Sequence, residues 1–191
     1  MNGKYILLAE DNPNDAELTL AALADSHMVN PVEVVHDGAE ALDFLCRRGP
    51  YAGRNQGDPA VILLDIKMPK VDGLEVLRTI KKDPNLRLIP VVMLTSSREE
   101  ADLVRSYENG VNAYVVKPLN FDDFIRAVRG IGCRVNLDDF GSGLSSFTYL
   151  KSFDVDAIKI DGSFVHNMAN SAYDRTVVRA INEIGRQLGI E

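Results

Sequence analysis

Acidic side chains stand where apolar segments of this chain stop. KYILLAED, near the N-terminus, ends in Glu10 and Asp11, and the apolar run VILLD ends in Asp65. An aspartate at the carboxyl end of a buried parallel strand lies where open α/β sheets bind their ligands. The core does not need such a residue, so a chemical role explains Asp65 better than a packing role.

Carboxylates that crowd together repel one another and bind protons more readily unless a cation is present. A hard divalent cation such as Mg²⁺ relieves that repulsion and prefers octahedral oxygen ligation. A carboxylate left partly free can then attack a phosphorus atom. Thr95 and Lys117 each follow another apolar segment, and their hydroxyl and ammonium groups can hold the oxygens of a transferred phosphoryl group. The pattern therefore favours a phosphoryl-accepting pocket.

Alternating strands and helices must position these residues. We expect strands at KYILLAED, VEVVHD, VILLD, IPVVMLTSS and NAYVVKP, each followed by a helix. Strands that read as continuous apolar runs belong to sheets covered on both faces. The prediction for residues 1–130 is an α/β, flavodoxin-like, doubly wound parallel sheet of order 2-1-3-4-5. That order places the ends of the first, third, fourth and fifth strands together.

Polar residues mark where the helices of this sheet begin. We expect Asp37 to cap the second helix and Asn120 to cap the fifth. Ser97 and Glu100 form a capping-box pattern for a fourth helix, which Gly110 would close. These boundaries leave the acidic residues in the loops between strands and helices.

The amino-acid composition excludes some classes of binding partner and indicates the cellular compartment. The 191 residues carry a formal net charge of −7, which argues against a sequence-independent grip on nucleic-acid phosphates. No apolar window is long enough to span a membrane, and no signal-peptide hydrophobic region opens the chain. Cys46 and Cys133 are expected to be reduced thiols. We therefore expect a cytoplasmic protein that binds neither nucleic acid nor membrane.

The strand–helix alternation continues after residue 130. CRVNLDD reads as a strand ending in Asp138 and Asp139, VDAIKID as another strand, and Ser171 and Asp174 open a final helix. A right-handed crossover would extend the sheet order to 2-1-3-4-5-6-7. A separate αβ lobe or an exchange between two chains is the alternative, although an isolated two-stranded lobe is marginally stable.

Four motifs carry a resemblance to a known family. LLAEDN, LLDIKMPKVDG, VVMLTSS and YVVKP resemble the signature motifs of response-regulator receiver domains, over residues 4–130. The resemblance implies that Asp65 is the phospho-acceptor and that Mg²⁺ or Mn²⁺ is the cofactor. The implied metal ligands are Glu10, Asp11, Asp65 and the backbone carbonyl of Lys67. The implied phosphoryl-binding and switch residues are Thr95, Lys117 and Tyr114, with a cis peptide before Pro118.

The same resemblance indicates the partners. The opening EDNPNDAELTLAAL and the long loop RGPYAGRNQGDPA are similar to single-domain receivers that serve phytochrome-type histidine kinases. A sensor histidine kinase is therefore the expected partner. Receivers of this family commonly dimerise through the surface of the fourth and fifth helices, so a homodimer is also implied.

Residues 131–191 resemble a different family. The string VNLDDFGSGLSSFTYLKSFDVDAIKIDGSFV is similar to the fifth and sixth βα units of the EAL family of cyclic di-GMP phosphodiesterases, which are TIM-type barrels. The corresponding positions are Asp138, Asp139, Lys159 and Asp161. The other barrel strands, including the one that carries the metal-binding glutamate, have no counterpart here, and a two-metal site needs ligands from several strands. The chain thus looks like a chimera with a non-catalytic barrel fragment.

Three functions remain open from the sequence. The first is a receiver-type phospho-switch, which is not an enzyme beyond its own dephosphorylation. The second is a cyclic di-GMP binder or phosphodiesterase that depends on Asp138 and Lys159. The third is a structural mosaic, engineered or recombined, without signalling output.

Overall fold

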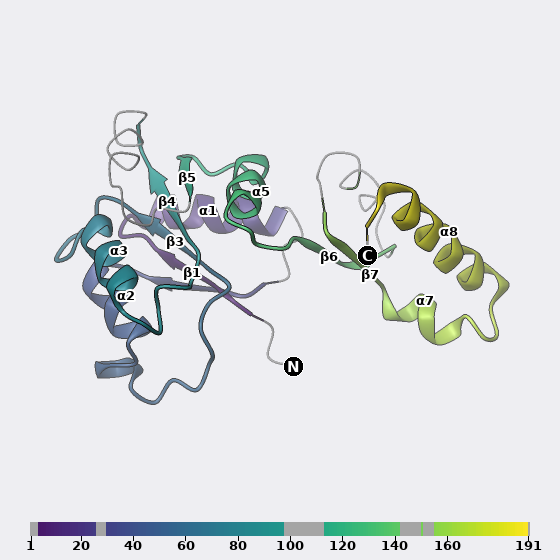
Figure 1. Cartoon of the computed structure of the whole chain (residues 1–191), viewed down its shortest axis with the longest axis horizontal. Coiled ribbons are helices and arrows are strands. Elements are labelled where there is room, and N and C mark those ends of the chain that lie inside the picture. The colour runs from purple at the N-terminus through teal and green to yellow at the C-terminus, as the bar shows by residue number, and fades with distance from the viewer. Residues whose placement is uncertain (1–3, 26–29, 98–112, 142–149, 151–154, 191) are drawn as a thin grey trace. The chain divides into compact units, whose positions relative to one another are not determined.

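The protein divides into two compact units, Met1–Cys133 and Arg134–Glu191. The computed structural model describes residues 4–25, 30–97, 113–141, 150 and 155–190 (Figure 1). The sequence analysis placed the boundary after residue 130, where the fifth helix was expected to end. Each unit contains its own sheet.

The first unit is built on a five-stranded parallel sheet. Its order is β2-β1-β3-β4-β5, which confirms the predicted 2-1-3-4-5 arrangement. The strands are β1 (Ile6–Ala9), β2 (Val32–Val35), β3 (Val61–Asp65), β4 (Val91–Thr95) and β5 (Ala113–Val116). Every residue of β1, β3 and β4 is buried, as expected for strands with helices over both faces.

Helices cover both faces of this sheet. Within the described residues, α1 and α5 lie on one side and α2 and α3 on the other (Figure 1). The elements are α1 (Pro13–Asp25), α2 (Gly38–Leu45), the 3₁₀ turn η1 (Gly49–Tyr51), α3 (Gly73–Lys82) and α5 (Phe121–Gly130). The predicted caps are confirmed, because Asp37 accepts the Glu40 N–H and Asn120 accepts the Asp123 N–H. The predicted fourth helix, after Ser97, lies outside the described residues.

The second unit has a smaller parallel sheet of two strands. It consists of β6 (Asn136–Phe140), β7 (Ala157–Ile160), α7 (Gly162–Asn167) and α8 (Ala172–Leu188). Ser171 caps α8 by accepting the Asp174 N–H, as the sequence predicted. The apolar face of α8 is centred on the buried Val178 and Ile181.

The two further βα units are present, but the expected sheet order 2-1-3-4-5-6-7 is wrong. Strand β6 pairs with β7 in a sheet of its own. The pairing is reinforced at both ends, because Asp156 N–H donates to Val135 O at 2.8 Å and Asp161 N–H donates to Phe140 O at 3.1 Å. Phe140 is buried within the same unit, which therefore has a small core of its own. The separate αβ lobe is the arrangement found.

Candidate functional site

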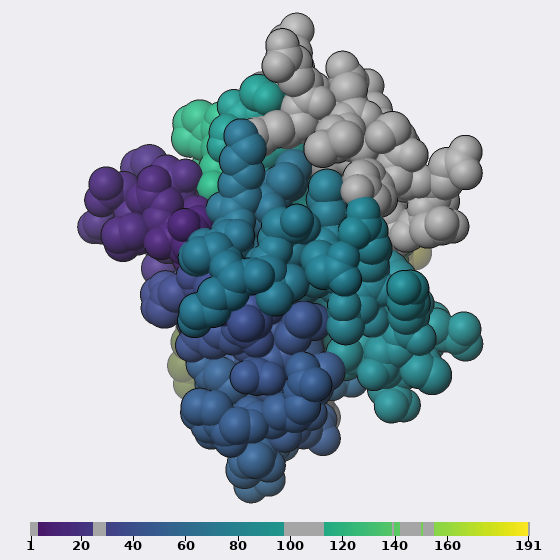
Figure 2. Space-filling model, turned by 90° about the vertical axis from the view of Figure 1, so that its left-hand side faces the viewer, coloured from purple at the N-terminus to yellow at the C-terminus, as the bar shows by residue number. Residues whose placement is uncertain are grey.

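The pocket lies at the carboxyl ends of the strands of the first unit. Figure 2 looks onto this end, where the purple segment that follows β1 and the blue and teal segments that follow β2 and β3 reach the surface. Glu10 and Asp11 follow β1, and Asp65 is the last residue of β3. Parallel pairing of β1 with β3 in register, Ala9 opposite Leu64, brings the two strand ends together.

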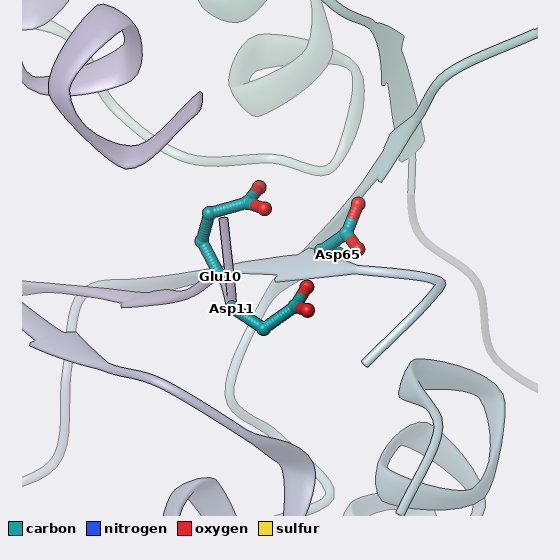
Figure 3. A group of neighbouring side chains, drawn as sticks. All are labelled: Glu10, Asp11 and Asp65. Atoms are coloured by element: carbon teal, nitrogen blue, oxygen red, sulfur yellow. The ribbon is translucent and has the colours of Figure 1, made fainter. Parts of the chain in front are cut away.

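Three carboxylates converge at this point. Glu10, Asp11 and Asp65 each offer an oxygen that lies within 4.8 Å of the others (Figure 3). Glu10 and Asp65 are buried, whereas Asp11 is exposed. The Asp65 Oδ2 accepts the Lys67 N–H at 3.0 Å, which fixes the orientation of the carboxylate. The pocket thus opens to solvent on the side of Asp11.

Lys117 supplies the positive charge of the pocket. Its Nζ lies 2.5 Å from Glu10 Oε2, 2.7 Å from Asp65 Oδ1 and 3.1 Å from Asp15 Oδ2. Only 12% of its side chain is exposed. Lys117 follows β5, and its backbone N–H donates to Thr95 O at 2.7 Å. The peptide bond between Lys117 and Pro118 is cis, as the resemblance implied.

Burial and the lysine act against each other on the carboxylates. Burial raises the pKa of Glu10 and of Asp65, and the attraction of Lys117 offsets only part of this effect. Burial opposes the charge on Lys117 as well, but the carboxylates of Asp65 and Glu10 outweigh it and raise the Lys117 pKa. One ammonium group is therefore not enough to neutralise the pocket.

The described residues fit a hard divalent cation. Carboxylate oxygens are the ligands that Mg²⁺ and Mn²⁺ prefer, and three residues offer them here. Glu10 Oε1 accepts the Asn12 N–H at 3.2 Å, whereas the buried Oε2 accepts no hydrogen bond. This Oε2 lies 2.5 Å from Lys117 Nζ, so a metal that binds it would compete with the lysine.

Thr95 and Tyr114 lie on the two strands beyond β3. Thr95 is fully buried at the end of β4, and its hydroxyl donates to Ser97 O at 2.9 Å. Tyr114, in β5, is half-buried and packs against the hydrophobic core cluster of the first unit. Contact with a phosphoryl group would therefore require the Thr95 hydroxyl to leave Ser97.

The loop between β3 and α3 is pressed tightly against its neighbours. A Cβ on Gly73 would lie 2.0 Å from Asp65 O, and a Cβ on Gly38 would lie 1.9 Å from Val71 O. Lys70 has a left-handed backbone with φ of 64°, and its Nζ lies 2.6 Å from Asp37 Oδ2. The close backbone approach at the two glycines and the ion pair between Lys70 and Asp37 restrict the conformation of the segment after Asp65. This segment contains Lys67, whose backbone carbonyl is a predicted metal ligand.

Asp15 is a pocket residue that the sequence analysis missed. It lies in the first turn of α1 and not at a strand end, which was the signal used. Its side chain is 34% exposed, and it approaches the pocket only through Lys117. No spacing in the sequence indicated this contact, because Asp11 lies before α1 begins at Pro13 and shares no helical face with Asp15.

The predicted positions of the second unit form a different arrangement. Lys159 Nζ lies 2.8 Å from Asp138 Oδ1, and 71% of the lysine side chain is exposed. Asp161 caps α7 by accepting the Ser163 N–H at 2.7 Å. The side chain of Asp139 lies outside the described residues. Among the residues described, the only group of three or more potential metal ligands is the one in the first unit.

A parallel 2-1-3-4-5 sheet with acidic residues and a lysine at its strand ends defines a response-regulator receiver. The family model of the response regulator receiver domain matches residues 6–129, and the chain belongs to this family. Such domains accept phosphoryl groups in two-component systems, bind Mg²⁺ or Mn²⁺ in an acidic pocket, and act with sensor histidine kinases.

Within this family, the chain is similar to a bacteriophytochrome response regulator and to the response regulator Rcp1. The structure of the bacteriophytochrome response regulator AtBRR is 62% identical, with a TM-score of 0.67, and covers 68% of this chain and 93% of that one. The response regulator Rcp1 of Synechocystis sp. is 43% identical over 128 residues, which are 67% of this chain and 86% of Rcp1. A Mn²⁺-bound crystal structure of Rcp1 has a TM-score of 0.55.

A second family model matches the rest of the chain. The EAL domain model matches residues 111–191 and overlaps the receiver match over β5 and α5. The cyclic di-GMP phosphodiesterase PdeB of Shewanella oneidensis is 45% identical over 69 residues, which are 36% of this chain and 8% of PdeB. The predicted joining of a receiver with a partial EAL segment is therefore confirmed. None of the described helices is both long and apolar enough to cross a membrane.

Proposed function

We propose that Asp65 accepts a phosphoryl group from a sensor histidine kinase of the phytochrome type. The observation that carries this proposal is the convergence of Glu10, Asp11 and Asp65 beside Lys117. The ligands of the divalent cation would be Glu10, Asp11, Asp65 and the backbone carbonyl of Lys67. The similarity to the bacteriophytochrome response regulator AtBRR supports the choice of kinase.

The transfer is a displacement at phosphorus. An Asp65 carboxylate oxygen attacks, a P–O bond forms, and the bond between phosphorus and the histidine nitrogen of the kinase breaks. The electron pair of that bond remains on the imidazole. A bound Mg²⁺ supplies charge neutralisation for the incoming phosphoryl oxygens. Lys117, 2.7 Å from Asp65 Oδ1, is placed to pair with one of those oxygens.

The product carries almost two negative charges at neutral pH. This charge attracts Lys117 and gives the Thr95 hydroxyl a stronger acceptor than Ser97 O. Movement of Thr95 at the end of β4 leaves room for Tyr114 of the adjacent β5 to change its packing. The signal would leave the pocket through this strand pair, where Thr95 stands opposite Val116.

The second unit has a non-catalytic role in this proposal. Its lysine–aspartate pair, Lys159 and Asp138, is exposed and mutually neutralised. A two-metal hydrolytic site clamps its ions with ligands from several strands, and the described part of this unit contains two strands. The net charge of −7 argues against nucleic acid as a partner.

Phosphate-affinity electrophoresis after treatment with acetyl phosphate and Mg²⁺ tests the acceptor. We expect a retarded band with the native chain and with Asp138→Asn, and no such band with Asp65→Asn or after chelation of Mg²⁺. A retarded band that survives in Asp65→Asn would refute the assignment.

The EAL match gives a specific reason to test cyclic di-GMP. Isothermal titration of the full chain with cyclic di-GMP, with Mg²⁺ or with Mn²⁺, is expected to give no binding heat. Binding that is lost in Asp138→Asn and kept in Asp65→Asn would instead assign nucleotide binding to the second unit.

A further inference from the structure

Lys117 has three acidic neighbours that are not equivalent. Two of them, Glu10 and Asp65, belong to the group of converging carboxylates that fits a divalent cation. The third, Asp15, lies 3.1 Å from the ammonium nitrogen and is not part of that group among the described residues. A metal that binds to Glu10 and Asp65 therefore competes with Lys117 for two of its three partners, but not for Asp15.

We propose that Asp15 is a positioning residue that holds the Lys117 ammonium when a divalent cation takes over Glu10 and Asp65. The proposal rests on the metal binding of the proposed function. Asp15 lies in the first turn of α1, outside the strand ends that carry Glu10 and Asp65, and 34% of its side chain is exposed. Asp15 is thus an ion-pair partner for the Lys117 ammonium that does not belong to the proposed metal ligands.

The burial of Lys117 makes a remaining carboxylate partner necessary. The side chain of Lys117 is only 12% exposed, and a buried charge that loses its partners is strongly unfavourable. With Asp15 present, the ammonium loses two of its three carboxylate partners and remains paired with the third. Without Asp15, the divalent cation and Lys117 would have to share Glu10 and Asp65, and their mutual repulsion would weaken metal binding.

The proposal predicts a specific coupling between two residues. Asp15→Asn is expected to weaken Mn²⁺ binding about fivefold, a normal size for groups in direct contact. Lys117→Met removes the competing cation and is expected to tighten Mn²⁺ binding. In the Lys117→Met background, Asp15→Asn should change the affinity by less than about twofold, because the ammonium that Asp15 holds is gone.

Electron paramagnetic resonance of free Mn²⁺, with the full chain, measures these affinities. Glu17→Gln is the matched control, because it removes one carboxylate from an exposed position of the same helix. Asp15→Glu keeps the charge and is expected to retain most of the native affinity. Circular dichroism verifies that each variant is folded, and Lys117→Gln replaces Lys117→Met if the latter does not fold.

The outcomes separate this proposal from the proposed function. Absence of Mn²⁺ binding by the native chain would refute the proposed metal site itself. If the native chain binds Mn²⁺ but Asp15→Asn and Glu17→Gln have equal affinities, Asp15 does not hold the lysine. An equal loss for Asp15→Asn with and without Lys117 would show only a general charge effect, and would also overturn the proposal.

Discussion

Each unit of this chain contains a lysine–aspartate pair with nearly the same separation. Lys117 Nζ lies 2.7 Å from Asp65 Oδ1, and Lys159 Nζ lies 2.8 Å from Asp138 Oδ1. The exposed fractions of lysine and aspartate are 12% and 5% in the first pair, but 71% and 28% in the second. The distance between lysine and aspartate therefore does not distinguish the buried acidic site from a surface ion pair, whereas the burial of the two side chains does.

The difference in burial comes from the sheets beneath the two pairs. Strand β3 is buried along its whole length, but every described side chain of β7 is half-buried or exposed. Five strands with helices on both faces hold the end of β3 in one position, and this rigidity keeps like charges together. A two-stranded sheet provides much less support. The first prediction tests how strongly the backbone around Asp65 is held.

Gly73→Ala is expected to have the largest effect, a loss of about 3 kcal/mol in the free energy of unfolding, at the upper end of overpacking costs. Its Cβ would lie 2.0 Å from Asp65 O, so α3 or the end of β3 must shift. Urea denaturation followed by circular dichroism measures the loss. Gly162→Ala in the second unit is the control, because its Cβ would meet only the His166 ring, at 3.7 Å. Similar losses for both variants would contradict the comparison.

The second largest difference is expected in the rates of amide hydrogen exchange of the two sheets. We expect the amides of β3 and β4 to exchange at least tenfold more slowly than those of β6 and β7, because buried apolar contacts govern local opening. Mass spectrometry of peptides from the full chain, after timed exposure to deuterated water, measures both in one sample. Equal protection of β3 and β7 would mean that the second unit is stabilised by contacts beyond its described core.

Asp65→Asn should stabilise the metal-free protein by about 1 kcal/mol, a common size for single substitutions. Burial raises the Asp65 pKa above its unfolded value, so the folded state binds the proton more tightly and stability falls as pH rises through that range. At neutral pH the ionised carboxylate is therefore a cost, which the amide removes. Thermal unfolding at neutral pH, with chelator, measures the gain.

The same measurement separates the two lysine–aspartate pairs. Asp138→Asn removes one partner of an exposed pair, and such pairs contribute about 0–1 kcal/mol. It is expected to leave stability unchanged or slightly lower. Added Mg²⁺ should reduce the advantage of Asp65→Asn, because the cation stabilises the carboxylate only in the native chain. A stabilised Asp138→Asn, or a destabilised Asp65→Asn, would argue against burial as the deciding difference.

The sequence predicted the parts of the pocket that follow from strand order. Apolar runs located the strands, and the ends of β1 and β3 brought Glu10 and Asp65 together as expected. Asp15 was not predicted, because it belongs to a helix and reaches the pocket through the long side chain of Lys117. Its contact depends on a tertiary distance that no local pattern expresses.

The pairing of the strands in the second unit also could not be predicted from local sequence patterns. Local pattern identified β6 and β7 as strands but did not fix the partner of β6, since the right-handed crossover rule allows several neighbours. The choice depends on specific contacts, such as the Asp156 carboxylate that accepts the Val135 N–H at 2.7 Å. Strand identity was thus readable from the sequence, whereas strand pairing between units was not.

The smallest expected effect concerns a hydrogen bond near the surface of the first unit, between Tyr51 and Glu40. Tyr51 OH donates to Glu40 Oε1 at 2.6 Å, and this hydrogen bond, with burial, raises the Tyr51 pKa to about 12. Because the folded pKa lies above the ordinary value near 10, the bond stabilises the protein at neutral pH and this contribution is lost as pH rises through 10 to 12. Glu40→Gln should move the Tyr51 titration toward the ordinary range. The phenolate absorbance of the native chain minus that of Tyr51→Phe measures it, and an unchanged titration in Glu40→Gln would assign the shift to burial instead.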